Sequence, residues 1–192
     1  MKLIVGIPEQ NRDEAAALYW EAFGTKLGFV LGPRYAAIHF ISSVMRSDHG
    51  ICAVDDSGRL LGVVGFKTHE GALVGGGFRD LRAVYGWISG AIRHGLLNAL
   101  ESETENKRFV MDGLFVAPEA RGQGIGSALL HAIAEEARTR GYRQVRLDVI
   151  DSNHRARMLY LHHGYYDLNE QKLGLLRYVF GFKSSTSMVC DL

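Results

Sequence analysis

The sequence has few cysteines and no long apolar run. Its two cysteines, Cys52 and Cys190, lie far apart in 192 residues. This spacing indicates neither a disulfide framework nor a thiolate cluster, so we predict two reduced thiols and no bound metal. No apolar stretch reaches the ~20 residues of a membrane span, and the first residues turn polar too soon for a signal peptide. We therefore expect a cytoplasmic protein with no membrane partner.

Charge of either sign is also not in excess. The 22 Lys and Arg residues against 21 Asp and Glu residues give a formal net charge of +1. Without a basic run, this balance argues against a nucleic-acid partner. A chain of 192 residues that is 47% hydrophobic can build one well-buried core. We expect a single domain, residues 1–192, without repeats.

Hydrophobic spacing in the first half predicts alternating strands and helices. Asn11, three residues before Glu14, is typical of a helix start. The elements expected are a strand over 2–7, a helix after Asn11, a loop broken by Gly24, Gly28, Gly32 and Pro33, a helix over 35–45, and a hairpin of strands 51–54 and 60–66. The glycines at 75–77 are expected to form a flexible connection rather than a phosphate cradle.

The second half begins with a helical insertion over about 78–105, as one interrupted helix or two short ones. It could shape a substrate pocket, form a homodimer contact, or add a core helix, and its spacing does not decide. The later elements expected are a strand over 108–116, a loop over 121–126, a helix before Gly141, a strand over 144–150, a helix from Asn153 to Gly164, and two final strands joined by a polar turn.

The most informative segment is Arg121-Gly122-Gln123-Gly124-Ile125-Gly126, directly before the helix. Glycine destabilises a helix, so glycines at a helix start indicate that the exposed backbone itself has a function there, such as binding a ligand. Unpaired N–H groups at a helix start, aided by the helix dipole and a nearby arginine, bind phosphate, most readily a pyrophosphate. A nucleotide-triphosphate loop would need a following Lys-Ser or Lys-Thr, and the dinucleotide motif G-x-G-x-x-G is one residue longer.

The loop resembles the [Q/R]-x-x-G-x-[G/A] motif of the GCN5-related N-acetyltransferase (GNAT) superfamily. "LFVAPEARGQGIGSALL" and "LDVIDSNHRARMLYLHHGYY" resemble that family's two strand–helix segments, so the likeness covers about residues 108–166. It implies an α/β (α+β) fold with a mixed, mostly antiparallel sheet flanked by helices. It also implies acetyl transfer from acetyl-CoA to a primary amine by direct attack, without a metal.

The resemblance assigns coenzyme contacts to three segments. The coenzyme pyrophosphate would bind the loop formed by Arg121, Gly122, Gln123, Gly124, Ile125 and Gly126. The pantetheine arm would pair, as an added strand would, with the backbone of Leu114, Phe115 and Val116. Asn153 and Ala156 belong to the motif N-x-x-A-x-x-x-Y-x-x-x-G, in which the asparagine contacts pantetheine. Asn153 also fits a helix N-cap, and both roles can hold together.

Three residues are candidates for proton transfer. Tyr160 matches the family's general acid, which protonates the leaving thiolate, although its apolar helical face also fits a core tyrosine. Asp148 shares one strand face with Arg146, opposite Val145 and Leu147, and it lies near the place where some members carry a catalytic glutamate. Asp112 is the second candidate base. Either aspartate could instead be a surface carboxylate or an ion-pair partner.

Weaker signals leave the acceptor unidentified, as either a small-molecule or a peptide amine. His162 and His163 are adjacent and have no third ligand at metal spacing. The acidic run with Glu101, Glu103 and Glu105 fits a solvated loop better than a site for a cationic amine. The rival function is a non-catalytic module that binds acyl-CoA and regulates a partner.

Overall fold

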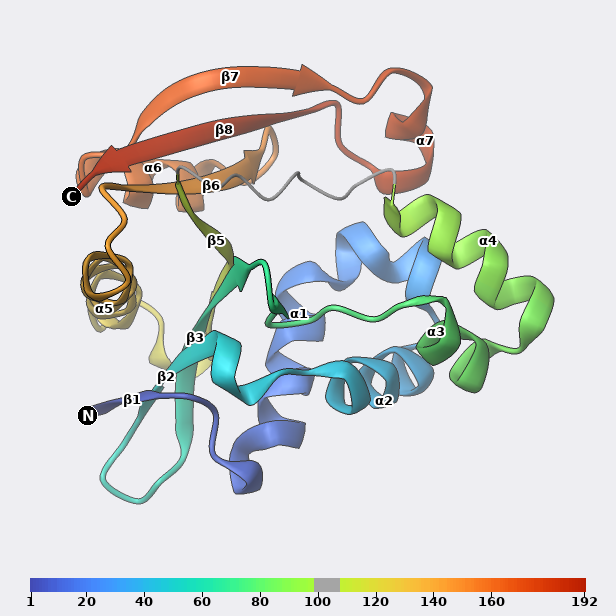
Figure 1. Ribbon diagram of the computed structural model, residues 1–192, viewed down its shortest axis with the longest axis horizontal. Helices are drawn as coiled ribbons and strands as arrows, with labels where there is room; N and C mark the ends of the chain where they lie inside the picture. The colour runs from blue at the N-terminus through green and yellow to red at the C-terminus, as the bar shows by residue number, and fades with distance from the viewer. Residues whose placement is uncertain (99–107) are drawn as a thin grey trace.

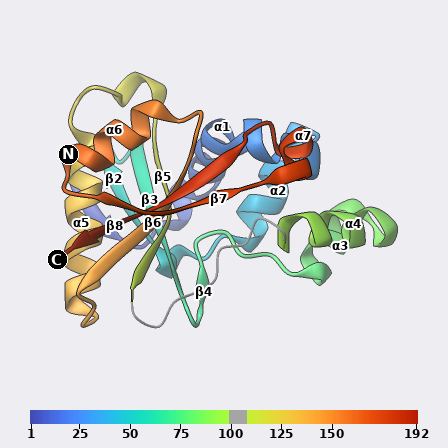
Figure 2. The same ribbon diagram turned by 90° about the horizontal axis from the view of Figure 1, so that it is seen from above.

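The fold is a single eight-stranded sheet with helices against both faces (Figure 1; Figure 2). The computed structural model describes residues 1–98 and 108–192. The strands are β1 (Lys2–Val5), β2 (Gly50–Val54), β3 (Leu60–Thr68), β4 (Gly71–Ala72), β5 (Phe109–Val116), β6 (Gln144–Ile150), β7 (Tyr166–Lys172) and β8 (Ser184–Asp191).

The helices are α1 (Arg12–Leu31), α2 (Arg34–Val44), α3 (Phe78–Tyr85), α4 (Trp87–Asn98), α5 (Ile125–Thr139), α6 (His154–His162) and α7 (Arg177–Phe180). Short 3-10 turns are η1 (Glu9–Asn11), η2 (Ser47–His49), η3 (Pro118–Ala120) and η4 (Gly174–Leu176). In Figure 1, α5 lies on one side of β2, β3 and β5, and α1 and α2 lie on the other.

The strand order is β1-β2-β3-β5-β6-β8-β7, and β4 pairs with β3 beside this path. All neighbouring strands are antiparallel except β5 and β6, which are parallel. A parallel pair needs a crossover connection, and α5 provides it. The expected mixed, mostly antiparallel sheet is thereby confirmed.

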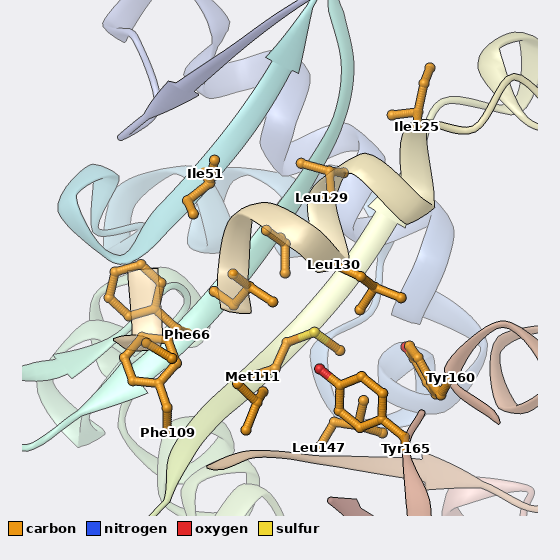
Figure 3. Close-up of a cluster of buried hydrophobic side chains, with 14 of the residues drawn as sticks. Ile51, Phe66, Phe109, Met111, Ile125, Leu129, Leu130, Leu147, Tyr160 and Tyr165 are labelled. Atoms are coloured by element: carbon orange, nitrogen blue, oxygen red, sulfur yellow. The ribbon is translucent and has the colours of Figure 1, made fainter. Parts of the chain in front are cut away.

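The α5-side cluster is one of two hydrophobic cores. Leu129 and Ile133 of α5 and Leu147 of β6 are at most 1% exposed, and each stabilises the fold by about 1.5–3 kcal/mol through burial. Met111, Tyr160 and other members pack around them (Figure 3). The alternation expected in β6 is confirmed, since its buried residues Val145, Leu147 and Val149 lie between partly exposed ones.

The α1-side cluster lies on the other face of the sheet. It includes Ala15 of α1, Ile41 of α2, Leu81 of α3 and Phe115 of β5. The insertion is indeed two short helices as far as it is described, because Gly86, at φ 80°, separates α3 from α4. Its remainder, with the acidic run, falls outside the described residues.

The loop expected at the glycines after Phe23 is wrong, because α1 continues to Leu31. Val30 and Leu31 are buried, at 0% and 2% exposure, and this packing outweighs the ~1 kcal/mol by which each helical glycine is disfavoured. An added Cβ at Gly24 would approach the Trp20 ring to 3.0 Å, so this glycine leaves room for the indole. The helix ends only before Gly32 and Pro33.

The polar turn expected between the last two strands is also wrong. The connection from β7 to β8 runs through η4 and α7. Phe180 and Phe182 in this connection are 2% and 6% exposed and pack into the α1-side cluster. Burial of these aromatic side chains is what turns the connection into a packed element.

Candidate functional site

The site is organised around the separation of two parallel strands. Phe109 pairs with Val145 and Val110 with Arg146, and no later residue of β5 pairs with β6 in the described chain. On its other edge, β5 remains paired with β3 as far as Val116. Residues 111–116 therefore present a strand edge without a strand partner, facing β6.

The glycine loop follows the carboxyl end of β5. Gly122 and Gly124 have φ values of 80° and 79°, and an added Cβ would meet nothing within 4 Å at either. Backbone conformation therefore requires glycine at these two positions. Gly126 differs, because an added Cβ would lie 3.2 Å from Leu159 Cδ2. Its task is to let α5 pack closely against α6.

The loop and the start of α5 present backbone amides that the described protein groups do not use. Within the described chain, the amides of residues 122–127 donate no hydrogen bond to another protein group. Arg121 Nε donates to the Val116 carbonyl at 3.1 Å, and Gln123 Nε2 donates to the Glu119 carbonyl at 3.0 Å. These two contacts brace the loop. The α5 dipole adds partial positive charge at the same place.

Asn153 lies at the carboxyl end of β6, on the same edge of the sheet as the loop. Its Oδ1 accepts a hydrogen bond from the Ala156 amide at 3.2 Å, so the expected N-cap is confirmed. Ala156 is partly buried against the α5-side cluster. The cap uses the carbonyl oxygen of the asparagine side chain, and the amide nitrogen takes no part in it.

The end of β5 carries side chains to both faces of the sheet. Leu114 and Val116 pack against the α5-side cluster. Phe115, at 3% exposure, turns the other way and meets the Tyr19 ring edge-on at a centroid distance of 5.6 Å. These side chains are committed to packing, so this segment can offer a ligand chiefly its backbone edge.

A cavity of about 430 Å³ opens on the α1 side of the strand separation, a volume in the range of small-molecule sites. Asp112 and Asp148 both line it. Each lies two residues beyond the last β5–β6 pair, Val110 with Arg146, so the strand period places both carboxylates on one face. The structure therefore brings the two candidate bases together.

Contacts fix the acidic end of the cavity. The Ser187 hydroxyl donates to Asp148 Oδ1, and Arg146 Nη2 lies 3.5 Å from the same carboxylate. Tyr19 of α1 also lines the cavity. Burial, and then the negative charge of Asp112, raise the pKa of the Tyr19 phenol, so its hydroxyl keeps its proton at neutral pH.

Tyr160 lies on the other side of the sheet, in the α5-side cluster. It is 6% exposed, and burial raises the pKa of its phenol to about 12. Its side chain points from α6 toward Met111 and Tyr165 (Figure 3). Met111 also lines the cavity, whereas Tyr160 is not among the described lining residues. Met111 thus lies between Tyr160 and the cavity, at the level where the strands separate.

Several lining residues have no counterpart in the sequence predictions. They are Tyr19, Phe23, Leu27 and Leu31 of α1, Phe40 of α2, Lys67 of β3, and Leu173, Leu176 and Phe182 of the final connection. Tyr19 and Phe23 fall within the helix predicted after Asn11, but that prediction ended at the glycines. Leu97 of the insertion also lines the cavity, whereas Leu81 is fully buried, so the insertion shapes the pocket and extends the core.

The structure also describes the residues of two weaker signals, the glycines at 75–77 and the adjacent histidines. An added Cβ at Gly76 would overlap the Phe40 ring, so this glycine serves close packing at the cavity wall. The His163 ring lies 5.4 Å from His131 and 5.4 Å from His162, between centroids. Among the described residues, no group of three or more His, Cys, Asp or Glu is arranged to hold a metal.

None of the described helices is both long and apolar enough to cross a membrane.

Comparison with known proteins agrees with this geometry. The family model described as "Acetyltransferase (GNAT) family" matches residues 12–165. Thialysine N-epsilon-acetyltransferase from Bos taurus is 39% identical over 79 residues, which are 41% of this chain and 46% of that protein. The chain thus spans about half the length of the curated relatives it matches.

Solved structures share the fold. The N-acetyltransferase from Staphylococcus aureus Mu50 gives a TM-score of 0.69 at 14% identity, over 98% of this chain and 100% of that one. A GNAT family acetyltransferase from Elizabethkingia anophelis, solved with acetyl-CoA bound, gives 0.51 at 12% identity, over 74% of this chain and 75% of that one. Because the family model covers most of the sequence, from the start of α1 to the residue before β7, this protein belongs to the acetyltransferase (GNAT) family.

Proposed function

We propose that this protein is an N-acetyltransferase that uses acetyl-CoA to acetylate a primary amine. The observation that carries the proposal is the separation of β5 from β6 beyond Val110. The N-terminus of α5, which would bind an anion, lies at the carboxyl end of these strands, and a cavity with two carboxylates lies on one face. The curated relatives, named for a primary amine acceptor, support the same chemistry.

The described residues fit the coenzyme. The backbone amides from Gly122 to Ser127 would hold the pyrophosphate, with Arg121 adding positive charge. The backbone edge of Leu114, Phe115 and Val116 would pair with the pantetheine arm, because no strand of the described residues pairs with its β6-facing side. Asn153 has a side-chain amide nitrogen that its cap does not use, and it would contact the pantetheine arm together with Ala156. Acetyl-CoA would supply the activated acetyl thioester.

The two aspartates would prepare the amine. An attacking amine must lose a proton, since an alkylammonium has a pKa near 10.4. Asp148 is held by Ser187, which suits it to fix the ammonium in place. We assign proton removal to Asp112, which faces the same space. In this assignment Asp148→Asn mainly raises KM, whereas Asp112→Asn mainly lowers kcat.

Tyr160 would protonate the departing thiolate. Its raised pKa keeps it protonated at neutral pH, and its side chain points toward the strand separation. The backbone edge of β5 would polarise the acetyl carbonyl by a hydrogen bond, and the rest of the rate would come from holding the two reactants together. A cytoplasmic location and a homodimer stay predictions.

The test is calorimetric titration with acetyl-CoA, together with thiol release in the presence of primary amines. Binding with turnover is expected. Binding without turnover on any amine would favour the non-catalytic regulatory module, and absence of binding would overturn both functions.

A matched pair of glycine variants locates the coenzyme. Gly124 and Gly141 have φ values of 79° and 81°, and an added Cβ meets nothing within 4 Å at either. Gly124→Ala and Gly141→Ala should therefore destabilise the fold equally, by about 1–2 kcal/mol. Only Gly124→Ala should weaken acetyl-CoA binding, and equal binding by both variants would contradict the assigned site.

A further inference from the structure

The cavity has a polar strip on its sheet side. Asp148 of β6 pairs with Ser187 of β8, and Ser185 of β8 pairs with both Ile150 of β6 and Gln171 of β7. Residues paired directly across strands point to the same face of a sheet, and all five line the cavity. The polar members therefore form a continuous strip across three strands. We call Asp148, Ser187, Ser185 and Gln171 the polar strip.

The two ends of the polar strip differ in how far their hydrogen-bonding groups are used. At the β6 end, the Ser187 hydroxyl donates to Asp148. At the β7 end, Ser185 Oγ lies 3.5 Å from the Val149 carbonyl, which is a weak contact. Among the described residues, the Gln171 side chain forms no hydrogen bond. The β7 end can therefore donate to a ligand from a hydroxyl and an amide group.

The two ends also differ in charge. Both carboxylates among the described lining residues, Asp112 and Asp148, lie at the β6 end, where β5 and β6 separate. At the other end, Lys172 borders the cavity next to Gln171, and it forms no ion pair with another described residue. An anionic group of a ligand would therefore be repelled at the β6 end and stabilised at the β7 end.

The length of the polar strip limits which amines can reach both ends. Neighbouring strands lie about 4.8 Å apart, and β7 is two strands away from β6. Gln171 is also displaced from Asp148 by two residues along the strands, so their Cα atoms are about 12 Å apart. An acceptor with its amine at Asp148 and an anionic group at Gln171 needs several methylene groups between the two.

We propose that the acceptor is an ω-amino acid, an amine with a carboxylate at the far end of a methylene chain, and that Ser185, Gln171 and Lys172 bind that carboxylate. The proposal rests on the proposed acetyl transfer. It adds to it the class of acceptor and the residues that determine specificity.

The first test compares each acid with its neutral amide. Thiol release is measured with ω-amino acids from 4-aminobutanoate to 8-aminooctanoate and with the primary carboxamide of each. The carboxamide keeps the chain length and removes the negative charge. We expect kcat/KM to be at least tenfold higher for the acid at the best length, because hydrogen bonds to a charged group are about twice as strong as neutral ones. Equal use of both series, or preference for the carboxamides, would overturn the proposal.

Variants on β7 test the carboxylate-binding end. Gln171 and Lys172 are both exposed, so substitutions there should not prevent folding. Gln171→Glu introduces a negative charge with almost no change in volume and should lower the ratio of acid to carboxamide kcat/KM at least tenfold. Lys172→Gln removes a positive charge and should lower the same ratio. An unchanged ratio in Gln171→Glu would overturn the proposal.

Lys183→Gln is the matched control for the charge at Lys172. Lys183 is exposed and is not among the described lining residues. Its substitution removes the same charge and should leave the ratio of acid to carboxamide unchanged. A loss as large as that of Lys172→Gln would mean that the overall charge of the protein, and not the cavity, sets the preference, and this would overturn the role of Lys172.

Binding of the reaction products separates this inference from the proposed function. Calorimetric titration with N-acetyl-ω-amino acids and their carboxamides requires no catalysis. Tighter binding of the acids that is lost in Gln171→Glu supports the carboxylate site even if no amine is acetylated, in which case only the proposed function fails. Acetylation of acids and carboxamides alike would retain the enzyme and overturn the ω-amino acid acceptor, as would equal or absent binding of both products.

Discussion

The two faces of the sheet differ in how completely they are filled. On the α5 side, Leu129, Ile133 and Leu147 are at most 1% exposed in one continuous cluster. The α1 side has residues as well buried, such as Ile41 and Leu81, but it also holds a cavity of about 430 Å³. The filled face holds the glycine loop and Tyr160 in position, and the hollow face leaves room for a ligand. One face of the sheet thus positions the loop and Tyr160, and the other face leaves space for a ligand.

The largest effect expected is catalytic and comes from the filled face. Tyr160→Phe removes the proposed acid with little change in volume, so kcat should fall about 10³-fold, equivalent to about 4 kcal/mol in the barrier. Acetyl-CoA affinity should not change. Tyr165→Phe is the control, because its ring is also buried and lies 5.8 Å from Tyr160 between centroids. Full activity of Tyr160→Phe would contradict the proposed acid and leave the α5 side with a structural role only.

The second prediction compares stability on the two faces. Leu129→Ala should lower the free energy of unfolding by about 3 kcal/mol, because it opens a void in a filled cluster. Leu27→Ala should lower it by about 1 kcal/mol, since Leu27 already borders a cavity. Urea denaturation of both variants measures the difference. Equal losses would mean that the two faces are packed alike.

The third prediction concerns alkaline pH. Burial raises the folded-state pKa of Tyr160 to about 12, against about 10 unfolded. The unfolded chain then releases this proton first, so the stabilisation is complete below pH 10 and is lost as pH rises toward 12. The loss from Tyr160 is about 2–3 kcal/mol.

Urea denaturation from pH 9 to 11.5 tests this sign. Tyr160→Phe should lose less stability than the wild type as pH rises. The comparison extends to the hollow face, because burial also raises the pKa of Tyr19. Tyr19→Phe should therefore reduce the alkaline loss as well. Stability that rises between pH 10 and 11.5 would contradict the prediction.

The smallest effect expected concerns Asn153, and it distinguishes its role as the cap of α6 from its proposed contact with the coenzyme. Asn153→Ala removes the cap of α6 and should lower the free energy of unfolding by about 1 kcal/mol. Asn153→Asp keeps a capping oxygen but loses the side-chain amide donor, so its stability should remain near that of the wild type. Weaker acetyl-CoA binding by Asn153→Asp would establish the coenzyme contact, and unchanged binding would leave Asn153 as a cap alone.

The sequence predicted the filled face better than the hollow one because the two depend on contacts of different range. The glycine loop, the alternation in β6 and the Asn153 cap are local patterns, and the structure contains all three. The cavity depends on α1 passing through Gly24 and Gly28, which local propensity disfavours. Burial of Val30 and Leu31 against distant segments decides that helix, and it also decides where Leu27 points.

The final connection shows the same limit. Between β7 and β8, the sequence predicted a polar turn, yet Phe180 and Phe182 are buried there and Leu173 reaches the cavity. Their partners lie on helices far away in the chain, so no local spacing could identify them. The two candidate bases, Asp112 and Asp148, stay a prediction, and only the strand register shows that they share one face.

The separation of β5 from β6 has a mechanical consequence. Two residue pairs, Phe109 with Val145 and Val110 with Arg146, form the whole strand seam between them in the described chain. The sheet is therefore two smaller sheets, β1-β2-β3-β5 and β6-β8-β7, hinged along that short seam. A ligand paired with the β5 edge would brace the hinge, so its arrival should slow amide hydrogen exchange in β8, on the far side of β6.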